Sequence, residues 1–243
     1  FLNSITASVK ATDDQEVAAK LAQRYDIAEI PVTDSEGRLI GFIPAEWAID
    51  ILHEEYEEDL ANIHGIQESD TEVMPYLEKS SLRMAKDRTI WLIICLITAT
   101  FTGFIIHHYE SLLSATVVLT AYIPMLMDSG GNAGTQASTT IIRALYAREV
   151  GFKDTFKVIL KEAKVGLITG TALVLVNTVR MILLDTRDIA ISLTVGITLL
   201  LSVILSKVIG GLMPLLGDRL NIDPTVMAGP LITTVVDTMV LLI

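Results

Sequence analysis

Long apolar runs separated by short polar interruptions make up residues 90–243. Five runs are expected to be helical, and each has at least the roughly 17–20 residues that a helix needs to cross a bilayer. The second and third are longer than one span, so we expect them to tilt or to protrude from the membrane. The pattern predicts a mainly α-helical membrane protein with five transmembrane helices. The runs cover residues 90–107, 112–147, 155–184, 188–216 and 224–243.

Residues 1–65 follow a different pattern, which is typical of a small α/β unit. A helix is expected to begin at residues 13–16, followed by strands over 29–32 and 39–43 and an acidic amphipathic helix over 46–60. Such a unit is too small to bury a self-sufficient core, so we expect it to pair with another copy. The apolar positions are Val17, Ala18, Leu21 and Ala22 in the first helix and Trp47, Ile51 and Leu52 in the second.

A polar connector of helical character, residues 66–89, joins this unit to a membrane domain over residues 90–243. The net charge of −11 lies entirely on residues 1–89, and residues 90–243 are formally neutral. Such an acidic part argues against nucleic-acid binding and favours the attraction of cations. The single Cys95 excludes an internal disulfide. The start on Phe1 without a signal-peptide pattern is typical of a piece of a longer chain.

Basic residues gather on one side of the predicted spans. They lie before the first span, between the second and third, and between the fourth and fifth, where Lys207 and Arg219 occur. The opposite loops carry only Arg187. The positive-inside rule then predicts a multi-pass protein of the cell membrane, with its N-terminal unit in the cytoplasm and its C-terminus outside.

Asp237 lies fourteen residues into the last apolar run. An ionised carboxylate within a span is costly unless it faces water, a cation or a partner. Gly229, Thr233 and Asp237 are spaced by four and share one face, so the Asp237 carboxylate and the Thr233 hydroxyl are candidate ligands of a hydrated Mg²⁺, which needs few direct carboxylates. The alternative is that Asp237 is protonated or hydrogen-bonded to a neighbouring helix as a structural contact.

Asp223 precedes Pro224 and is expected to cap the start of the last helix. On one continuous helix it would lie about 21 Å along the axis from Asp237 and on nearly the same face. We therefore expect one acid at the mouth of a cation path and one deep within it. The alternative for Asp223 is that capping is its sole role.

A second polar interruption falls within the second apolar run, at residues 124–136, with its glycines in residues 130–136. Its glycines are expected either to bend or unwind the span or to pack closely against another helix. Asp128, Asn132 and Gln136 follow at every fourth position and make one polar stripe if the segment stays helical. Such a stripe faces a bundle interior or water. We expect the path to be lined by Gly130, Gly131, Asn132, Gln136 and Gly229.

A dense set of carboxylates precedes the membrane domain. One interpretation is a solvated helix face. The other is a regulatory metal site, because carboxylates that face one another repel unless divalent cations lie between them. The set comprises Glu54, Glu55, Glu57, Glu58, Asp59, Glu68, Asp70 and Glu72.

The segments Pro124–Leu145 and Asp223–Asp237 resemble the signature spans of the MgtE-type magnesium channel family. Residues 1–65 look like the second half of a CBS-domain pair, through residues 28–34 and 37–43, and the connector takes the position of that family's plug helix. The resemblance implies a homodimer with ten spans around a Mg²⁺-gated pore. It also implies that Asp237 is the pore carboxylate and that Asp223 is the acid at the cytoplasmic end of the same helix.

The sequence thus predicts a channel that conducts hydrated Mg²⁺, or Mn²⁺ or Co²⁺, into the cytoplasm and that closes when cytosolic Mg²⁺ binds the acidic part. Its expected partners are a second copy, the ion and the lipid bilayer, with no nucleic acid, and it is not expected to be an enzyme. Two alternatives stay open. One is an antiporter that exchanges a divalent cation for Na⁺ or H⁺, and the other is a membrane-anchored metal sensor that transports nothing.

Overall fold

The computed structural model describes residues 8–66, 75–115, 117–185 and 188–243, and the chain divides into two compact units, Phe1–Ala61 and Asn62–Ile243. The expected contrast between a small α/β unit and a long helical one is present. The acidic positions Glu68, Asp70 and Glu72 lie outside the described residues.

The first unit is a three-stranded sheet of order β1-β2-β3 with helices α1 and α2. Strand β1 pairs parallel to β2, and β2 pairs antiparallel to β3. The Asp14 carboxylate caps α1 by accepting a hydrogen bond from the Glu16 amide at 2.9 Å. Both predicted helices and both predicted strands are confirmed. The bounds are Val9–Lys10 (β1), Gln15–Tyr25 (α1), Glu29–Thr33 (β2), Leu39–Pro44 (β3) and Ala45–Ile63 (α2).

The core of this unit is smaller than the apolar pattern predicts. Ile30 of β2 is fully buried against alanines of α1, which let the helix approach the sheet closely. Val17 is 45% exposed and Trp47 is 59% exposed, so neither belongs to the core, and for these two positions the predicted apolar stripes are wrong. The reason is that residues one or two positions from a buried alanine point to another side of the helix.

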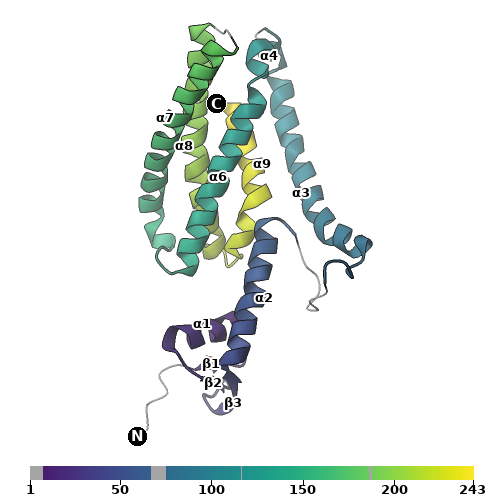
Figure 1. Cartoon of the computed structure of the whole chain (residues 1–243), viewed down its shortest axis with the longest axis vertical. Coiled ribbons are helices and arrows are strands. Elements are labelled where there is room, and N and C mark those ends of the chain that lie inside the picture. Colours follow the sequence, from purple (N-terminus) through teal and green to yellow (C-terminus); the bar gives the residue numbers. More distant parts are fainter. Residues whose placement is uncertain (1–7, 67–74, 116, 186–187) are drawn as a thin grey trace. The chain divides into compact units, whose positions relative to one another are not determined.

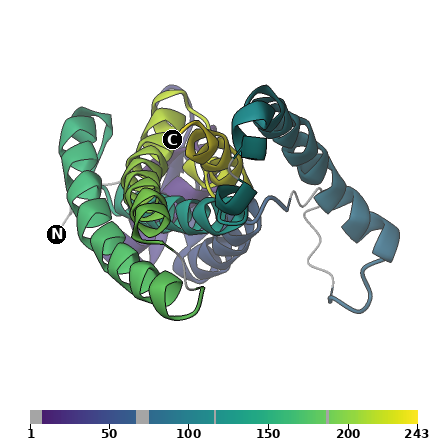
Figure 2. The same ribbon diagram turned by 90° about the horizontal axis from the view of Figure 1, so that it is seen from above.

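The membrane domain begins with one long helix rather than with a separate connector helix. Helix α3 runs from Ser81 to His108, so the last residues of the connector continue into the first apolar run. Ser80 caps this helix by accepting a hydrogen bond from the Arg83 amide at 3.3 Å. Figures 1 and 2 show α3 standing apart from the other long helices at its Ser81 end. It packs mainly against α9.

Helices α6, α7, α8 and α9 form a bundle in which α8 contacts the other three. The second apolar run contains three helices, and Pro124 occupies the first turn of the longest of them, α6. The bounds are Glu110–Ala115 (α4), Val117–Thr120 (α5), Ile123–Tyr146 (α6), Phe152–Asp154 (η1), Thr155–Leu183 (α7), Ile189–Arg219 (α8), Pro224–Met227 (η2) and Gly229–Leu242 (α9).

Within the described residues, four helical segments are long and apolar enough to cross a membrane: Ser81–His108, Phe152–Leu183, Ile189–Arg219 and Pro224–Leu242. Helix α6 has 24 residues, which is sufficient length, but its polar residues keep it out of this group. Four of the five predicted spans therefore have the expected apolar character. The remaining one, the second predicted span, contains α6, a long helix with a polar face.

Close helix packing in the bundle depends on glycine. A Cβ atom on Gly210 of α8 would overlap the carbonyl oxygen of Gly134 on α6. A Cβ on Gly134 would in turn lie 2.9 Å from Cγ2 of Ile232 on α9. The first is an approach of backbone to backbone and the second of backbone to side chain, and a larger residue blocks both. They hold α8 and α9 against the buried side of α6.

Candidate functional site

Helix α6 presents its polar stripe on an exposed face. Asp128, Asn132 and Gln136 are all exposed, and the residues between them, among them Ala133 and Ala137, are buried in the bundle. The helix is unbroken from Ile123 to Tyr146, so the unwinding expected as one alternative is wrong for this segment. The stripe therefore exists as one continuous line of polar side chains along a helix of membrane length.

The glycines of the same segment lie on the opposite, packed side. A Cβ on Gly130 would be 2.9 Å from Cγ2 of Val240 and 3.0 Å from Oγ of Ser206. A Cβ on Gly131 would be 3.2 Å from Cγ2 of Thr233. Both positions support the close-packing alternative. Their contact with a cation path stays a prediction.

Asp237 and Asp128 come from different helices and interact electrostatically with each other. Asp237 lies on α9 and is half-buried, one turn beyond Thr233. The Thr233 hydroxyl donates a hydrogen bond to the Gly229 carbonyl at 3.1 Å, which leaves its oxygen lone pairs available as acceptors. Two carboxylates and a hydroxyl oxygen are hard ligands of the kind that Mg²⁺ or its bound waters accept.

Asp128 is the member of this group that sequence reasoning missed as a ligand. It was part of the predicted stripe, but nothing in the chain's pattern pairs it with Asp237, because the two lie more than a hundred residues apart. The packing of α6 against α9 brings them together. The sequence signal that points to Asp128 is its spacing, since Asn132 and Gln136 follow it at intervals of four residues.

Asp223 is a capping residue, as predicted. Its Oδ1 accepts hydrogen bonds from the Thr225 amide at 2.8 Å and from the Tyr146 hydroxyl at 3.2 Å, so it also ties η2 to the end of α6. The expected continuous helix from Asp223 to Asp237 is wrong. The chain leaves helical geometry at Ala228, with φ −103° and ψ −170°, and Gly229 follows at φ +49°. Glycine suits that position because other residues rarely adopt a positive φ.

The charge pattern predicts that Lys207 lies in a loop between two spans, and this prediction is wrong. Lys207 lies within α8 and is only 5% exposed, and its Nζ donates a hydrogen bond to Oε1 of Gln136 at 3.2 Å. It is therefore no evidence for the orientation of the chain in a membrane. Glu162 of α7 is also buried, at 7% exposure. The sequence analysis used Lys207 only to predict orientation and gave Glu162 no role, although a charged residue inside a long apolar run indicates a functional or paired position.

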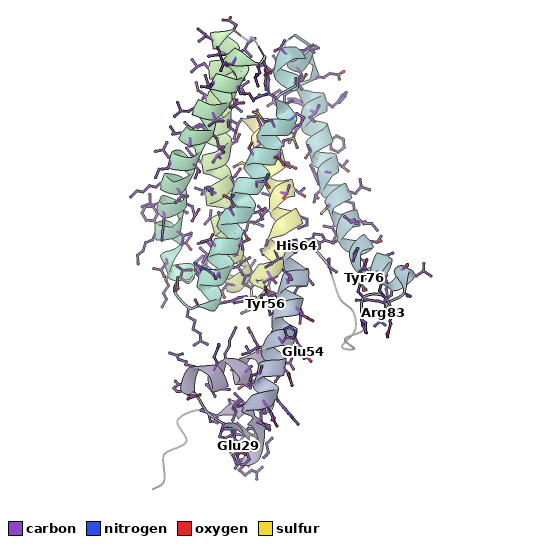
Figure 3. The ribbon with its side chains drawn as sticks, in the orientation of Figure 1. Glu29, Glu54, Tyr56, His64, Tyr76 and Arg83 are labelled. Atoms are coloured by element: carbon purple, nitrogen blue, oxygen red, sulfur yellow. The ribbon has the colours of Figure 1, made fainter. Side chains whose placement is uncertain are left out.

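The acidic residues of α2 are mainly on its surface, where Glu54 projects from the helix (Figure 3). Glu55 and Asp59 are half-buried, and Glu55 also accepts a hydrogen bond from Nε2 of Gln15 at 2.8 Å. Partial burial raises the pKa of the Glu55 carboxyl, and the nearby acids Asp14, Glu16 and Glu58 raise it further, while the Gln15 hydrogen bond lowers it. Here the acids of α1 and α2 do repel one another.

No group of three or more His, Cys, Asp or Glu side chains in the described part of the chain is arranged to hold a metal ion. The regulatory set Glu54, Glu55, Glu57, Glu58 and Asp59 forms no such site by itself. A metal bound by a single copy through the described residues would thus have at most two of these ligands in reach. The remaining ligands would have to be water, backbone or hydroxyl oxygens, or groups of another chain.

Comparison with known proteins places this geometry in a family. Residues 123–243 match the model of the family described as "MgtE: Divalent cation transporter". This match contains α6, α7, α8 and α9, and hence Asp128, Asp237 and Asp223.

Three curated relatives are each named "Magnesium transporter MgtE". That of Thermus thermophilus is 35% identical over 243 residues, which is 100% of this chain and 53% of the relative. Those of Enterococcus faecalis and Bacillus subtilis are 31% and 29% identical, over 98% and 97% of this chain and 51% of each relative. The chain spans about half the length of these relatives. A transporter family agrees with the expectation that the chain is not an enzyme. The family match and the whole-length similarity together show that the chain belongs to the MgtE family of divalent cation transporters.

Proposed function

We propose that this chain forms one half of a homodimeric channel that conducts hydrated Mg²⁺, and also Mn²⁺ or Co²⁺, into the cytoplasm. Each copy contributes five transmembrane helices, with α6 as the one that carries a polar face. The N-terminal unit is a CBS-like cytoplasmic domain of a cell-membrane protein, and the C-terminus is outside. The observation that carries the proposal is the exposed line Asp128, Asn132 and Gln136 on α6, which packs against α9, the helix that carries Asp237.

The exposed polar face of α6 favours a second copy. Polar side chains on a membrane helix are costly against lipid and cost little against water or a polar partner. Two such faces turned toward each other enclose a polar path and bring two copies of Asp128 and two of Asp237 to its wall. Four carboxylates suit Mg²⁺, which dehydrates reluctantly and is bound largely through its waters. A path of this kind conducts without covalent chemistry.

The experiment that tests the proposal is Mg²⁺ entry into proteoliposomes loaded with a Mg²⁺-sensitive dye. Wild-type protein in an inward Mg²⁺ gradient is expected to give uptake well above that of protein-free vesicles, without any Na⁺ or H⁺ gradient. Uptake that appears only with an opposing Na⁺ or H⁺ gradient would favour an antiporter. No uptake under either condition would leave the non-transporting metal sensor as the better account.

The Asp223→Ala variant is expected to lower Mg²⁺ flux only in part, because a charge at the mouth of a path concentrates ions without selecting them. Loss of the hydrogen bond from the Thr225 amide should also reduce stability by about 0.5–2 kcal/mol, the range for lost caps. The measurements are initial flux and thermal unfolding in detergent. Complete loss of flux with unchanged stability would instead make Asp223 a primary ligand.

For regulation, we propose that Mg²⁺ bound between the acidic helix α2 and the connector closes the channel. Without the ion, like charges on these surfaces repel and the closed arrangement is disfavoured. The ion shifts this balance only as far as it binds the closed form more tightly than the open one. The support for this proposal is the repulsion around Glu55 and the net negative charge of the chain before the membrane domain.

Replacing Glu54, Glu55, Glu57, Glu58 and Asp59 by their amides should relieve this repulsion permanently. The connector should then be protected from proteolysis at lower Mg²⁺, with a smaller change across a Mg²⁺ titration. A matched control is Glu29→Gln with Glu36→Gln, which removes exposed carboxylates of the same unit outside α2. If the amide variant and the control both titrate like the unmodified chain, the acidic face of α2 is only solvated surface.

A further inference from the structure

The buried ammonium group of Lys207 contacts the polar line of α6 from the packed side of that helix. Lys207 of α8 is 5% exposed, and its Nζ donates a hydrogen bond to Oε1 of Gln136 at 3.2 Å. Gln136 is itself exposed and forms one end of the polar line. Lys207 thereby fixes the direction of the Gln136 amide, since the oxygen is turned toward the bundle.

A buried carboxylate, that of Glu162, lies on a third helix close to the same face of α8. Glu162 of α7 packs against α8, because a Cβ on Gly211 would lie 3.1 Å from Cγ of Glu162. Gly211 follows Lys207 by four residues, so the two lie on one face of α8. Glu162 is buried, and the positive charges near it are those of Lys207 and, with a smaller effect, the exposed Lys161; among the described residues no ion pair within 4 Å joins Glu162 to Lys207. Three helices thus contribute to one polar cluster, in which Lys207 and Glu162 are buried and Gln136 is exposed.

The charges in this cluster have consequences for a cation path. A buried charge is costly unless an opposite charge or hydrogen bonds compensate it, and removing one partner of such a pair is more costly than replacing both. An uncompensated ammonium also repels a nearby cation, and it repels a divalent ion with twice the energy of a monovalent ion at the same distance. The charge of Lys207 on the packed side of α6 must therefore be compensated for Mg²⁺ to approach the polar face of α6.

We propose that Lys207 and Glu162 are positioning residues of the conduction path. Lys207 holds the Gln136 amide in place, and Glu162 cancels the charge of Lys207 so that the path stays attractive to divalent cations. This inference rests on the proposed channel function. Neither residue lies on the exposed face of α6 or is required to touch the ion.

The test compares Mg²⁺ uptake by wild-type protein with that of Glu162→Gln, Lys207→Met and the double variant. Glu162→Gln should lower uptake by about tenfold or more and raise the Mg²⁺ concentration for half-maximal uptake, because it leaves the ammonium uncompensated. The double variant should recover to the level of Lys207→Met, several times above Glu162→Gln. Lys207→Met alone should lose the hydrogen bond to Gln136 and leave Glu162 without its counter-charge. A lone carboxylate does not repel a cation, so uptake should fall by only a few fold.

A matched control separates this pair from charge in general. Combining Glu162→Gln with Lys161→Met removes a nearby positive charge that is exposed, and it should not restore uptake. Uptake by Glu162→Gln equal to wild type would overturn the inference. So would recovery with Lys161→Met, or a double variant as inactive as Glu162→Gln.

Thermal unfolding of the detergent-solubilised variants gives a readout that does not depend on transport. The double variant should be more stable than the sum of the two single losses predicts, because the pair is coupled. Additive losses would contradict the pairing. If the wild-type protein carries no Mg²⁺, the channel proposal fails, while the unfolding data still decide whether Glu162 and Lys207 act as a pair.

Discussion

Asp237→Asn is expected to abolish Mg²⁺ flux while the protein stays folded. The change removes a negative charge from α9 at nearly constant volume. Asp237 is half-buried within a span, where a charged carboxylate is costly, so an amide of the same shape should not destabilise the folded state. The measurements are uptake into dye-loaded proteoliposomes and, on the same preparation, size-exclusion profile and thermal unfolding.

Asp188→Asn is the matched control for this substitution. Asp188 is exposed at the start of α8, and its side chain makes no capping hydrogen bond, so uptake should be unchanged. Undiminished uptake by well-folded Asp237→Asn protein would show that Asp237 is a structural contact between helices. A loss of uptake that accompanies aggregation would call for Asp237→Glu, which keeps the charge and should retain part of the flux.

Gly210→Ala is expected to destabilise the bundle strongly. The added Cβ overlaps the backbone carbonyl of Gly134, and backbone atoms cannot rotate away as a flexible side chain can. Overpacking typically costs 1–3 kcal/mol, and we expect about 3 kcal/mol or more here. For a chain of this length, that corresponds to a fall in melting temperature of roughly 6–12 °C.

Gly103→Ala is the control for Gly210→Ala. Gly103 lies in α3, and a Cβ placed there meets nothing within 4 Å. This variant should be neutral or slightly more stable, since alanine favours a helix by up to about 1 kcal/mol over glycine. Equal melting temperatures for the two variants would mean that α6 and α8 do not approach each other closely at Gly134.

Local patterns were sufficient to predict most elements of the chain. Asp223 caps the helix that follows it, as predicted. The two strands on either side of the turn at residues 34–37 also lie at nearly their predicted positions. Both features depend only on residues that are close in the sequence. The polar stripe of α6 likewise follows from the four-residue spacing of Asp128, Asn132 and Gln136 alone. Features of this kind need no knowledge of what packs against them.

Features that depend on packing between helices could not be predicted in this way. The break at Ala228 and Gly229 interrupts a run that reads as one apolar span. The burial of Lys207 and the proximity of Asp128 to Asp237 depend on which faces α6, α8 and α9 turn toward one another. Hydrophobic periodicity indicates that a helix has a buried side, but it does not identify the helix that covers it.

The central claim is that Mg²⁺ crosses the membrane passively along the polar face of α6 and past Asp237. The most direct test is Mg²⁺ uptake into proteoliposomes with Na⁺ and H⁺ equal on both sides and the membrane potential imposed by a K⁺ gradient and valinomycin. We predict that uptake by wild-type protein rises steeply as the interior is made negative, and that Asp237→Asn protein shows no uptake at any potential. Uptake that is independent of potential, or absent until a Na⁺ or H⁺ gradient is added, would contradict the account.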